Sequence, residues 1–142
     1  MKIQITRIDK SLPLPEYQTK GAVAFDMYSR EDATIAPREL KLLPSNLIIK
    51  VPEGYALLIK PRSSLAKKKG LVLQSSQLID QDYHGPEDEI GLMVYNFTDA
   101  PSEVKKGERI AQGFFVPIGI GEWEEVESIG AESRGGFGST GS

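Results

Sequence analysis

Glycine and proline interrupt this chain so often that only short regular segments can form between them. The 142 residues include 14 Gly and 9 Pro, spread along the whole length, and both residue types mark turns. Helical periodicity is absent, apart from room for a turn or two near residues 64–69. Segments rich in β-branched and aromatic residues are predicted strands at 3–8, 46–51, 55–60, 89–97, 109–116 and 123–129. The pattern predicts an all-β fold of the sandwich, jelly-roll or barrel type.

Composition narrows the classes of function. The net charge of −3 is small, so we expect neither a nucleic-acid nor a membrane partner. The chain has no cysteine, and its first ten residues alternate apolar and polar side chains, unlike a signal peptide or a membrane span. We expect a cytoplasmic or otherwise intracellular protein, with nuclear, viral and phage origins left open. A single domain over residues 1–132 and a mobile, glycine-rich arm over residues 133–142 are predicted.

The most basic stretch of the chain is RSSLAKKKG, residues 62–70. Arg62 supplies a planar fork of N–H donors, and Ser63 and Ser64 supply hydroxyl groups just before the predicted helical turn. Donors of this kind suit the oxygens of a phosphate group. The alternative is a solvated basic surface, and the glycine pattern of a P-loop is missing.

Acidic residues stand out at two places. Asp80 and Asp82 lie close to Tyr83 in a turn-rich hairpin candidate, residues 78–92. A carboxylate at a strand end can act as general base on a water molecule, and a tyrosine ring can stack on a planar or sugar ligand. Asp26 is a single acid inside an apolar, strand-like segment, so it needs a partner, a cation or solvent. Each acid can instead be structural, for example by capping its own turn.

His84 is the single histidine of the chain, and this count argues against a catalytic triad and against a zinc site. A Ser-His-Asp triad would need it, yet the chain has no GxSxG elbow. One histidine and no cysteine make a poor zinc site. Any metal should be a hard ion such as Mg²⁺, held by carboxylates, phosphates and water.

The tail SRGGFGSTGS, residues 133–142, combines groups that suit a phosphorylated ligand. Arg134 is a charge, Phe137 a stacking face, and Ser139 and Thr140 are hydroxyl donors among glycines that permit close approach. Such a segment can close over a ligand and exclude water. The alternative is an ordinary frayed terminus.

Five segments together resemble the motifs of the trimeric dUTPase family, the dUTP nucleotidohydrolases. A single match to PRSSLA or GFGSTG would be modest evidence, whereas five matches in the family's order are specific. They are AVAFDMYS (22–29), PRSSLA (61–66), LIDQDYHG (78–85), GERIAQ (107–112) and RGGFGSTG (134–141).

The resemblance implies a jelly-roll-like distorted barrel and a homotrimer in which each active site is built from three subunits. It implies a dUTP diphosphatase that hydrolyses dUTP to dUMP and pyrophosphate with Mg²⁺, limiting uracil incorporation into DNA and supplying dUMP for dTMP synthesis. Such a reaction depends on positioning and charge stabilisation. This requirement agrees with a chain that lacks an obvious nucleophile.

The resemblance also implies roles for individual residues. Asp80 would be the base that orients the water attacking the α-phosphorus, and Asp26 would hold the metal through water. Tyr83 would lie under the deoxyribose and refuse a 2′-OH, while the backbone of the hairpin would read uracil. Phe137 would stack on uracil. The residues implied to reach the phosphates are Arg62, Ser63, Ser64, Gln112, Arg134, Ser139 and Thr140.

The chain departs from the family pattern around the third and fifth motifs. Gln77 stands where a glycine is usual, and residues 86–88 are inserted into the hairpin. Arg134 lies three residues before Phe137 instead of the common five. A non-catalytic nucleotide-binding or regulatory module on the same fold therefore stays an alternative.

A second alternative is dCTP deaminase, a relative with a similar RSSLA segment. That family carries a catalytic Glu where this chain has Met93, and an Arg where it has Lys67. Because a thioether cannot move a proton, this reading is the weaker one.

Overall fold

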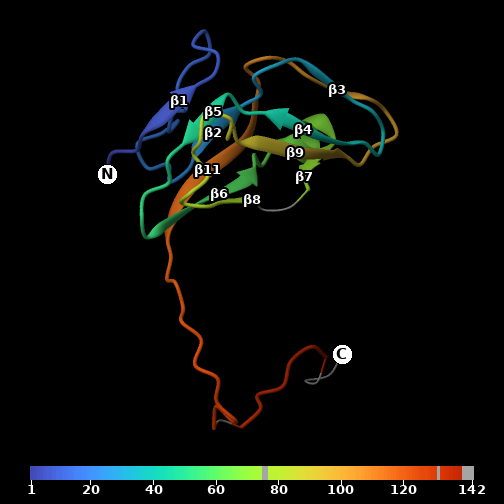
Figure 1. The fold of residues 1–142 in the computed structure, drawn as a ribbon. Helices are drawn as coiled ribbons and strands as arrows, with labels where there is room; N and C mark the ends of the chain where they lie inside the picture. The colour runs from blue at the N-terminus through green and yellow to red at the C-terminus, as the bar shows by residue number, and fades with distance from the viewer. Residues whose placement is uncertain (75–76, 131, 139–142) are drawn as a thin grey trace.

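The computed structural model describes residues 1–74, 77–130 and 132–138, and its described part is almost entirely β-structure (Figure 1). The strands are β1 Ile5–Arg7, β2 Phe25–Tyr28, β3 Ala33–Ile35, β4 Leu40–Pro44, β5 Leu47–Ile49, β6 Tyr55–Pro61, β7 Leu71–Leu73, β8 Gln77–Ile79, β9 Gly91–Asn96, β10 Ser102–Val104 and β11 Arg109–Pro117. The helix is α1, Leu65–Lys69. The all-β prediction is confirmed.

The strands form two main antiparallel sheets and two smaller pairs. The main sheets have the strand orders β2–β11–β6–β8 and β4–β9–β7, and the pairs are β1–β5 and β10–β3. Alternation along each strand turns every second side chain into a shared interior; in β9, Leu92 and Val94 are fully buried. The interior also includes Met27, Ile35, Leu43, Leu47, Ile49, Leu57, Ile59, Leu71, Ile90 and Ile110, all fully or almost fully buried.

The predicted turn of helix at residues 64–69 is confirmed as α1. Gly70 ends it in the left-handed conformation, with φ of 65°, and its N–H donates to the carbonyl of Ala66 at 3.0 Å. Glycine is the usual residue at this position because other side chains are strained there.

Five of the six predicted strands are confirmed, and the sixth is wrong. Residues 123–129 contain no strand, and Trp123 and Ile129 are 96% and 93% exposed. After Pro117, Ile118 N–H donates to the Gly54 carbonyl at 2.9 Å, and residues 118–120 line a hollow together with Tyr55 and Leu78. Beyond them the chain runs away from the sheets (Figure 1). Aromatic and β-branched residues favour a strand only where a neighbouring strand is available to pair, and this segment has none within the described chain.

The hairpin expected at residues 78–92 is also wrong in its topology. β8 pairs with β6 in the four-stranded sheet, whereas β9 pairs with β4 and β7 in the three-stranded sheet. Residues 80–90, called the 80–90 loop below, therefore cross from one sheet to the other. Gln77 links the two sheets beside this crossing: its Nε2 donates to the Gly91 carbonyl at 2.6 Å, and its Oε1 accepts from Met93 N–H at 3.0 Å.

No helix in the described part of the chain is long and apolar enough to cross a membrane. The expected boundary between a domain ending at residue 132 and an arm over residues 133–142 stays a prediction.

Candidate active site

Asp26 is the centre of a polar cluster at one end of the four-stranded sheet. It lies on β2 and is only 2% exposed, so its carboxylate needs partners. Arg109 Nη1 lies 3.2 Å from Oδ2, and Arg62 Nε lies 3.5 Å from Oδ1. The Gln112 amide donates to Oδ1 at 3.5 Å. The sequence-predicted residues Asp26, Arg62 and Gln112 are thus brought together, and two guanidinium groups give the cluster a positive charge overall.

A β-bulge at Ile110 creates this arrangement. Residues 109 and 112 lie three positions apart on β11, so strict alternation would turn them to opposite faces. In the observed register Arg109 lies opposite Tyr28 and Gln112 opposite Asp26, because Ile110 is an extra residue in the ladder. The bulge therefore returns Arg109 to the face of the cluster.

Arg109 is a residue that sequence reasoning did not single out, although it lies inside the GERIAQ segment. The available signal was its charge within a predicted strand, but the bulge is invisible to a period-two pattern. Tyr28 lies opposite Arg109 on the same face. Burial, together with the Glu16 carboxylate, raises the pKa of the Tyr28 phenol, so it stays neutral near pH 7.

The serines of the basic loop lie between β6 and α1. Ser63 is exposed and Ser64 half-buried. Ser64 occupies the N-cap position of α1 without a hydrogen bond from its side chain to the helix. Lys69 is engaged elsewhere, with Nζ 2.8 Å from Glu108 Oε2. The accessible donors at this end of the sheet therefore include Arg62, Arg109 and the two serines.

Asp80 and Tyr83 lie on the 80–90 loop. A shallow depression of about 400 Å³ is lined there by Leu78, Ile79, Asp80, Asp82 and Tyr83. Asp80 is exposed and Tyr83 is 38% exposed. The Tyr83 hydroxyl donates to the carbonyl of Glu89 at 3.2 Å, so one edge of the ring is anchored while the rest remains accessible.

The Asp26 cluster, with Arg62, and the Asp80–Tyr83 pair lie at opposite ends of β6. Arg62 follows Pro61, the last residue of the strand, whereas Asp80 follows Ile79, which pairs with Leu57 near the start. At about 3.3 Å per residue the two residues lie roughly 15–20 Å apart along the strand. Within one chain, Asp80 therefore cannot act on a phosphate group held by Arg62.

The tail lies at neither end of the sheet. Residues 121–130 and 132–138 are remote from both groups (Figure 1), and Phe137 is fully exposed. Arg134 and Phe137 are thus not brought to the site of their own chain. Ser139 and Thr140 lie outside the described residues.

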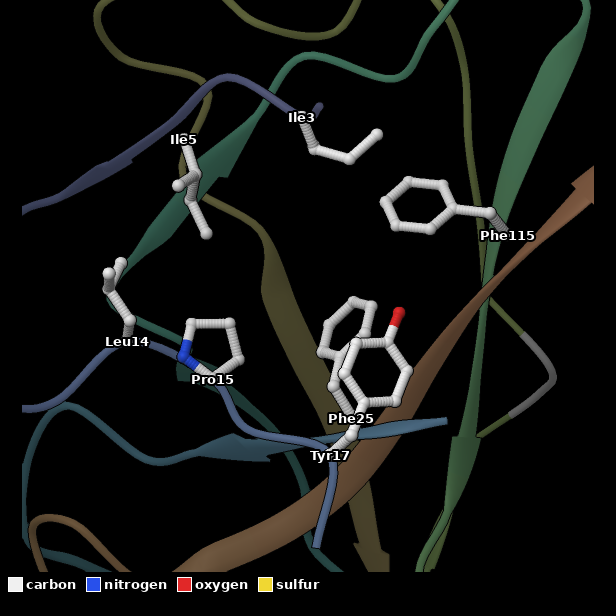
Figure 2. Close-up of a pocket in the computed structure, with 7 residues that line it drawn as sticks. All are labelled: Ile3, Ile5, Leu14, Pro15, Tyr17, Phe25 and Phe115. Carbon is white, nitrogen blue, oxygen red and sulfur yellow. The ribbon is translucent and has the colours of Figure 1, made fainter. Parts of the chain in front are cut away.

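A different pocket, of about 180 Å³, is almost entirely apolar (Figure 2). Phe25 and Phe115 form its floor, with Tyr17 packed edge-on against Phe25 at a ring separation of 5.7 Å. Phe25 and Asp26 are neighbours on one strand and point to opposite faces. The pocket therefore lies on the other side of the sheet from the Asp26 cluster and has no charged group to bind a phosphate.

The described residues contain no group of three His, Cys, Asp or Glu side chains that could hold a metal ion. Asp26 is the only carboxylate of its cluster and is already paired with two arginines. This donor set fits a Mg²⁺ ion held mainly by substrate phosphates and water, and does not fit a cage made by protein ligands.

The fold and the site define a jelly-roll-like β protein that offers anion-binding groups at one end of its main sheet and a carboxylate–tyrosine pair at the other. Such groups suit an enzyme that acts on a phosphorylated ligand. The sequence model of the dUTPase family matches residues 10–141, and the chain belongs to that family. It is a dUTP diphosphatase, a hydrolase of nucleotide metabolism.

Relatives cover the whole chain. The deoxyuridine 5′-triphosphate nucleotidohydrolase of Nautilia profundicola is 42% identical over 144 residues, and that of Dictyoglomus turgidum is 43% identical over 148 residues; each alignment covers 99% of both chains. Among solved structures, the G164S mutant dUTPase of Staphylococcus bacteriophage 80alpha, bound to dUpNHpp, is 27% identical with a TM-score of 0.88, covering 99% of both chains. The jelly-roll-like fold is confirmed.

Proposed function

We propose that this enzyme hydrolyses dUTP to dUMP and pyrophosphate in composite sites, each assembled from several copies of the chain. The observation that carries the proposal is the separation of Arg62 and Asp80 at opposite ends of β6. Two groups that one reaction needs, yet that lie too far apart in one chain, can meet only if different copies supply them. Binding of dUpNHpp by the phage relative supports a triphosphate substrate.

In this proposal the Asp26 cluster binds the triphosphate. Arg62, Ser63, the Ser64 backbone and Gln112 donate to phosphate oxygens, and Asp26 orients both Arg62 and Gln112. Fixed donors lower the barrier because they stabilise charge without reorganising during the reaction. Mg²⁺ carried by the phosphates would neutralise further charge, with Asp26 contacting it through water.

Asp80 from a second copy is the general base. Its carboxylate accepts the proton of the water that attacks the α-phosphorus, and the P–O bond to the pyrophosphate leaving group breaks. Tyr83 lies under the deoxyribose and leaves no room for a 2′-OH, while the backbone of the 80–90 loop reads uracil. A site built to hydrogen-bond one base leaves buried groups unpaired with another base, which is a strong rejection.

A third copy supplies the tail, with Phe137 stacking on uracil and Arg134, Ser139 and Thr140 reaching the phosphates. The course of residues 121–130 and 132–138, away from their own sheets, supports this role. A homotrimer also gives the outer face of β6 and β8 a partner, since Leu78 is 55% exposed there beside Asp80. The enzyme would limit uracil incorporation into DNA and supply dUMP inside the cell.

The test is release of pyrophosphate from dUTP, dCTP, dTTP and UTP by purified protein with Mg²⁺. Selective turnover of dUTP is expected, and Asp80→Asn should lower kcat by about 10²–10⁴-fold, as expected on removal of a general base. Binding of dUTP without turnover by the unaltered protein would instead identify a regulatory module. Ammonia release from dCTP would identify a deaminase.

A further inference from the structure

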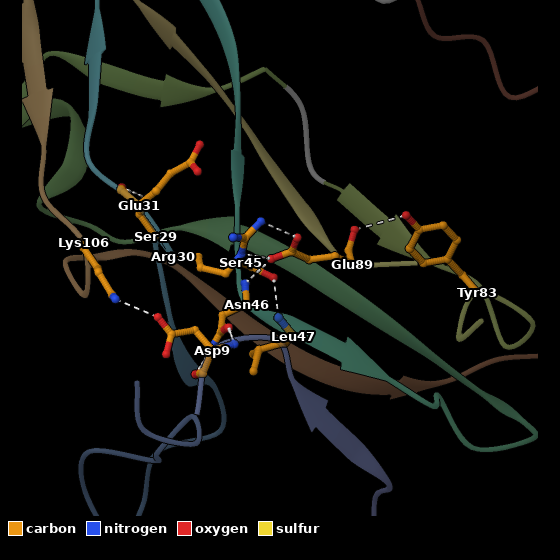
Figure 3. A network of polar contacts seen from close by, with 10 residues as sticks. All are labelled: Asp9, Ser29, Arg30, Glu31, Ser45, Asn46, Leu47, Tyr83, Glu89 and Lys106. Atoms are coloured by element: carbon orange, nitrogen blue, oxygen red, sulfur yellow. Dashed lines mark hydrogen bonds and ion pairs between the residues drawn. The ribbon is translucent and has the colours of Figure 1, made fainter. Parts of the chain in front are cut away.

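Two neighbouring residues anchor the end of the 80–90 loop. The backbone of the buried Ile90 donates to the Leu47 carbonyl at 2.9 Å and accepts from Ser45 N–H at 3.0 Å, and the carboxylate of Glu89 is the side-chain anchor. Arg30 donates to it twice, from Nε to Oε2 at 2.8 Å and from Nη2 to Oε1 at 3.0 Å (Figure 3). The N–H of Asn46 donates to Oε2 at 2.7 Å. The Glu89 side chain is 19% exposed and that of Arg30 30%. The hydrogen bond to Glu89 raises the pKa of the Arg30 guanidinium.

Both partners of the Glu89 carboxylate, Arg30 and Asn46, are themselves held by further hydrogen bonds. Arg30 N–H donates to the Pro44 carbonyl at 2.7 Å. Asn46 is buried, and its side chain accepts from Asp9 N–H at 2.6 Å and donates to the Asp9 carbonyl at 3.0 Å. The loop is therefore tied through Glu89 to segments that are themselves fixed by several hydrogen bonds.

The backbone carbonyl of Glu89 also holds the Tyr83 side chain. The Glu89 carbonyl accepts the Tyr83 hydroxyl at 3.2 Å (Figure 3). The inserted residues between them close a tight local turn, with Gly85 N–H donating to Asp88 Oδ2 at 2.7 Å and Asp88 N–H to the Gly85 carbonyl at 3.1 Å. The position of the Tyr83 ring thus depends on where Glu89 is held.

We propose that Arg30 and Glu89 are positioning residues that set the selectivity of the enzyme against ribonucleotides. The inference rests on the proposed function, in which the Tyr83 ring lies under the deoxyribose. The ion pair, together with the hydrogen bond from Ile90 N–H to the Leu47 carbonyl, fixes the Glu89–Ile90 peptide. This peptide fixes the Tyr83 hydroxyl, and the ring cannot retreat to admit a 2′-OH. Neither Arg30 nor Glu89 contacts the substrate in this arrangement.

The test compares kcat/KM for dUTP with that for UTP in Glu89→Gln, Arg30→Met and Tyr83→Phe. Each change should lower the dUTP/UTP ratio by roughly three- to tenfold, the value of one lost hydrogen bond, mainly because UTP is accepted better. Arg30→Lys keeps the charge without the fork of donors and should recover part of the ratio. Because Tyr83→Phe removes one exposed hydroxyl, it tests the proposal even if a change at Glu89 prevents folding.

The matched control is Asp99→Asn, which breaks an exposed ion pair with Arg38 (2.9 Å) on a different turn and should leave the ratio unchanged. Combining Tyr83→Phe with Glu89→Gln should give less than the sum of the two effects, because both act on the same ring. Amide hydrogen exchange in residues 80–90 should be faster in Glu89→Gln than in Asp99→Asn, whatever the activity.

Failure of the proposed function and failure of the positioning role would give different results. If the unaltered enzyme does not hydrolyse dUTP, the proposed function fails, while exchange still reports whether Glu89 anchors the loop. If dUTP is hydrolysed but the ratio is unchanged in both Tyr83→Phe and Glu89→Gln, the positioning role is refuted.

Discussion

The two ends of β6 present chemical groups in different ways. At one end the Asp26 cluster is built on strands, and the register of β2 against β11 with a bulge at Ile110 sets its geometry. At the other end Asp80 and Tyr83 lie on a loop that crosses between sheets and is held by side-chain anchors. Strand-borne groups are fixed by the same hydrogen bonds that make the fold, whereas loop-borne groups can be loosened without unfolding the sheets. Substitutions that loosen the 80–90 loop should therefore change selectivity or turnover without unfolding the sheets, whereas substitutions on the strands, at either end, should also lower stability.

The largest expected effect tests whether the two ends serve one reaction from different chains. Asp80→Asn and Arg62→Ala should each be nearly inactive alone. When the two variants are co-expressed and purified as mixed trimers, about one quarter of sites should combine an intact Arg62 with an intact Asp80 from a neighbour. The measurement is pyrophosphate release per trimer.

A chain carrying both substitutions, mixed with Asp80→Asn chains, is the control and should recover nothing, because no subunit then supplies Asp80. Failure of the original mixture to recover activity would mean that each chain builds its own site. That result would refute the composite site, in which two chains supply Arg62 and Asp80.

Removal of residues 133–142 is expected to have the next largest effect, on turnover only. The deleted tail lies away from the sheets in its described part, so the midpoint of urea unfolding should stay the same. Turnover of dUTP should fall at least tenfold, because the tail would close the site and exclude water. Loss of the folded state in the truncated protein would show that the tail belongs to the domain.

A substitution of Gln77, on β8 beside the 80–90 loop, tests how much this end of the molecule contributes to stability. Gln77→Ala removes two hydrogen bonds and leaves the Gly91 carbonyl and the Met93 N–H without that partner. The free energy of unfolding should fall by about 1–3 kcal/mol, measured by urea denaturation. Gln81→Ala is the matched comparison: Gln81 accepts from Gly54 N–H at 2.6 Å at an exposed position, where water replaces it at smaller cost. Equal losses in both variants would remove Gln77 as a link between the sheets.

Sequence reasoning predicted the fold class and named Asp26, Arg62 and Gln112, which the structure brings together, and its errors have physical causes. β3 and β10 have three residues each, too few for their composition to be read, whereas the equally short β1 and β5 lie within longer apolar segments that were predicted as strands. Residues 123–129 contain Trp, Val and Ile, which are common in strands, but no strand of the described chain pairs with them. The 80–90 loop has the turn residues of a hairpin, yet only long-range pairing decides that its flanking strands join different sheets.

Arg109 shows the same limit at the scale of one residue. A period-two pattern assigns Arg109 and Gln112 to opposite faces, and only the register with β2 reveals the bulge. Glu89 and Arg30 lie 59 positions apart, so no local pattern links them. What escaped prediction in each case is a contact made by tertiary structure.

The smallest expected effect concerns the strand-built end. Arg109→Met keeps the apolar stem of the side chain but removes one of the two guanidinium groups that face the buried Asp26. Because Arg109 is 43% exposed and Arg62 remains, solvent reduces the loss to about 1 kcal/mol of unfolding free energy. Lys60→Met, at the exposed position opposite Gln112 on β6, should cost less in the same urea titration. If Lys60→Met is the more damaging change, general positive charge and not the pairing of Asp26 stabilises this end of the sheet.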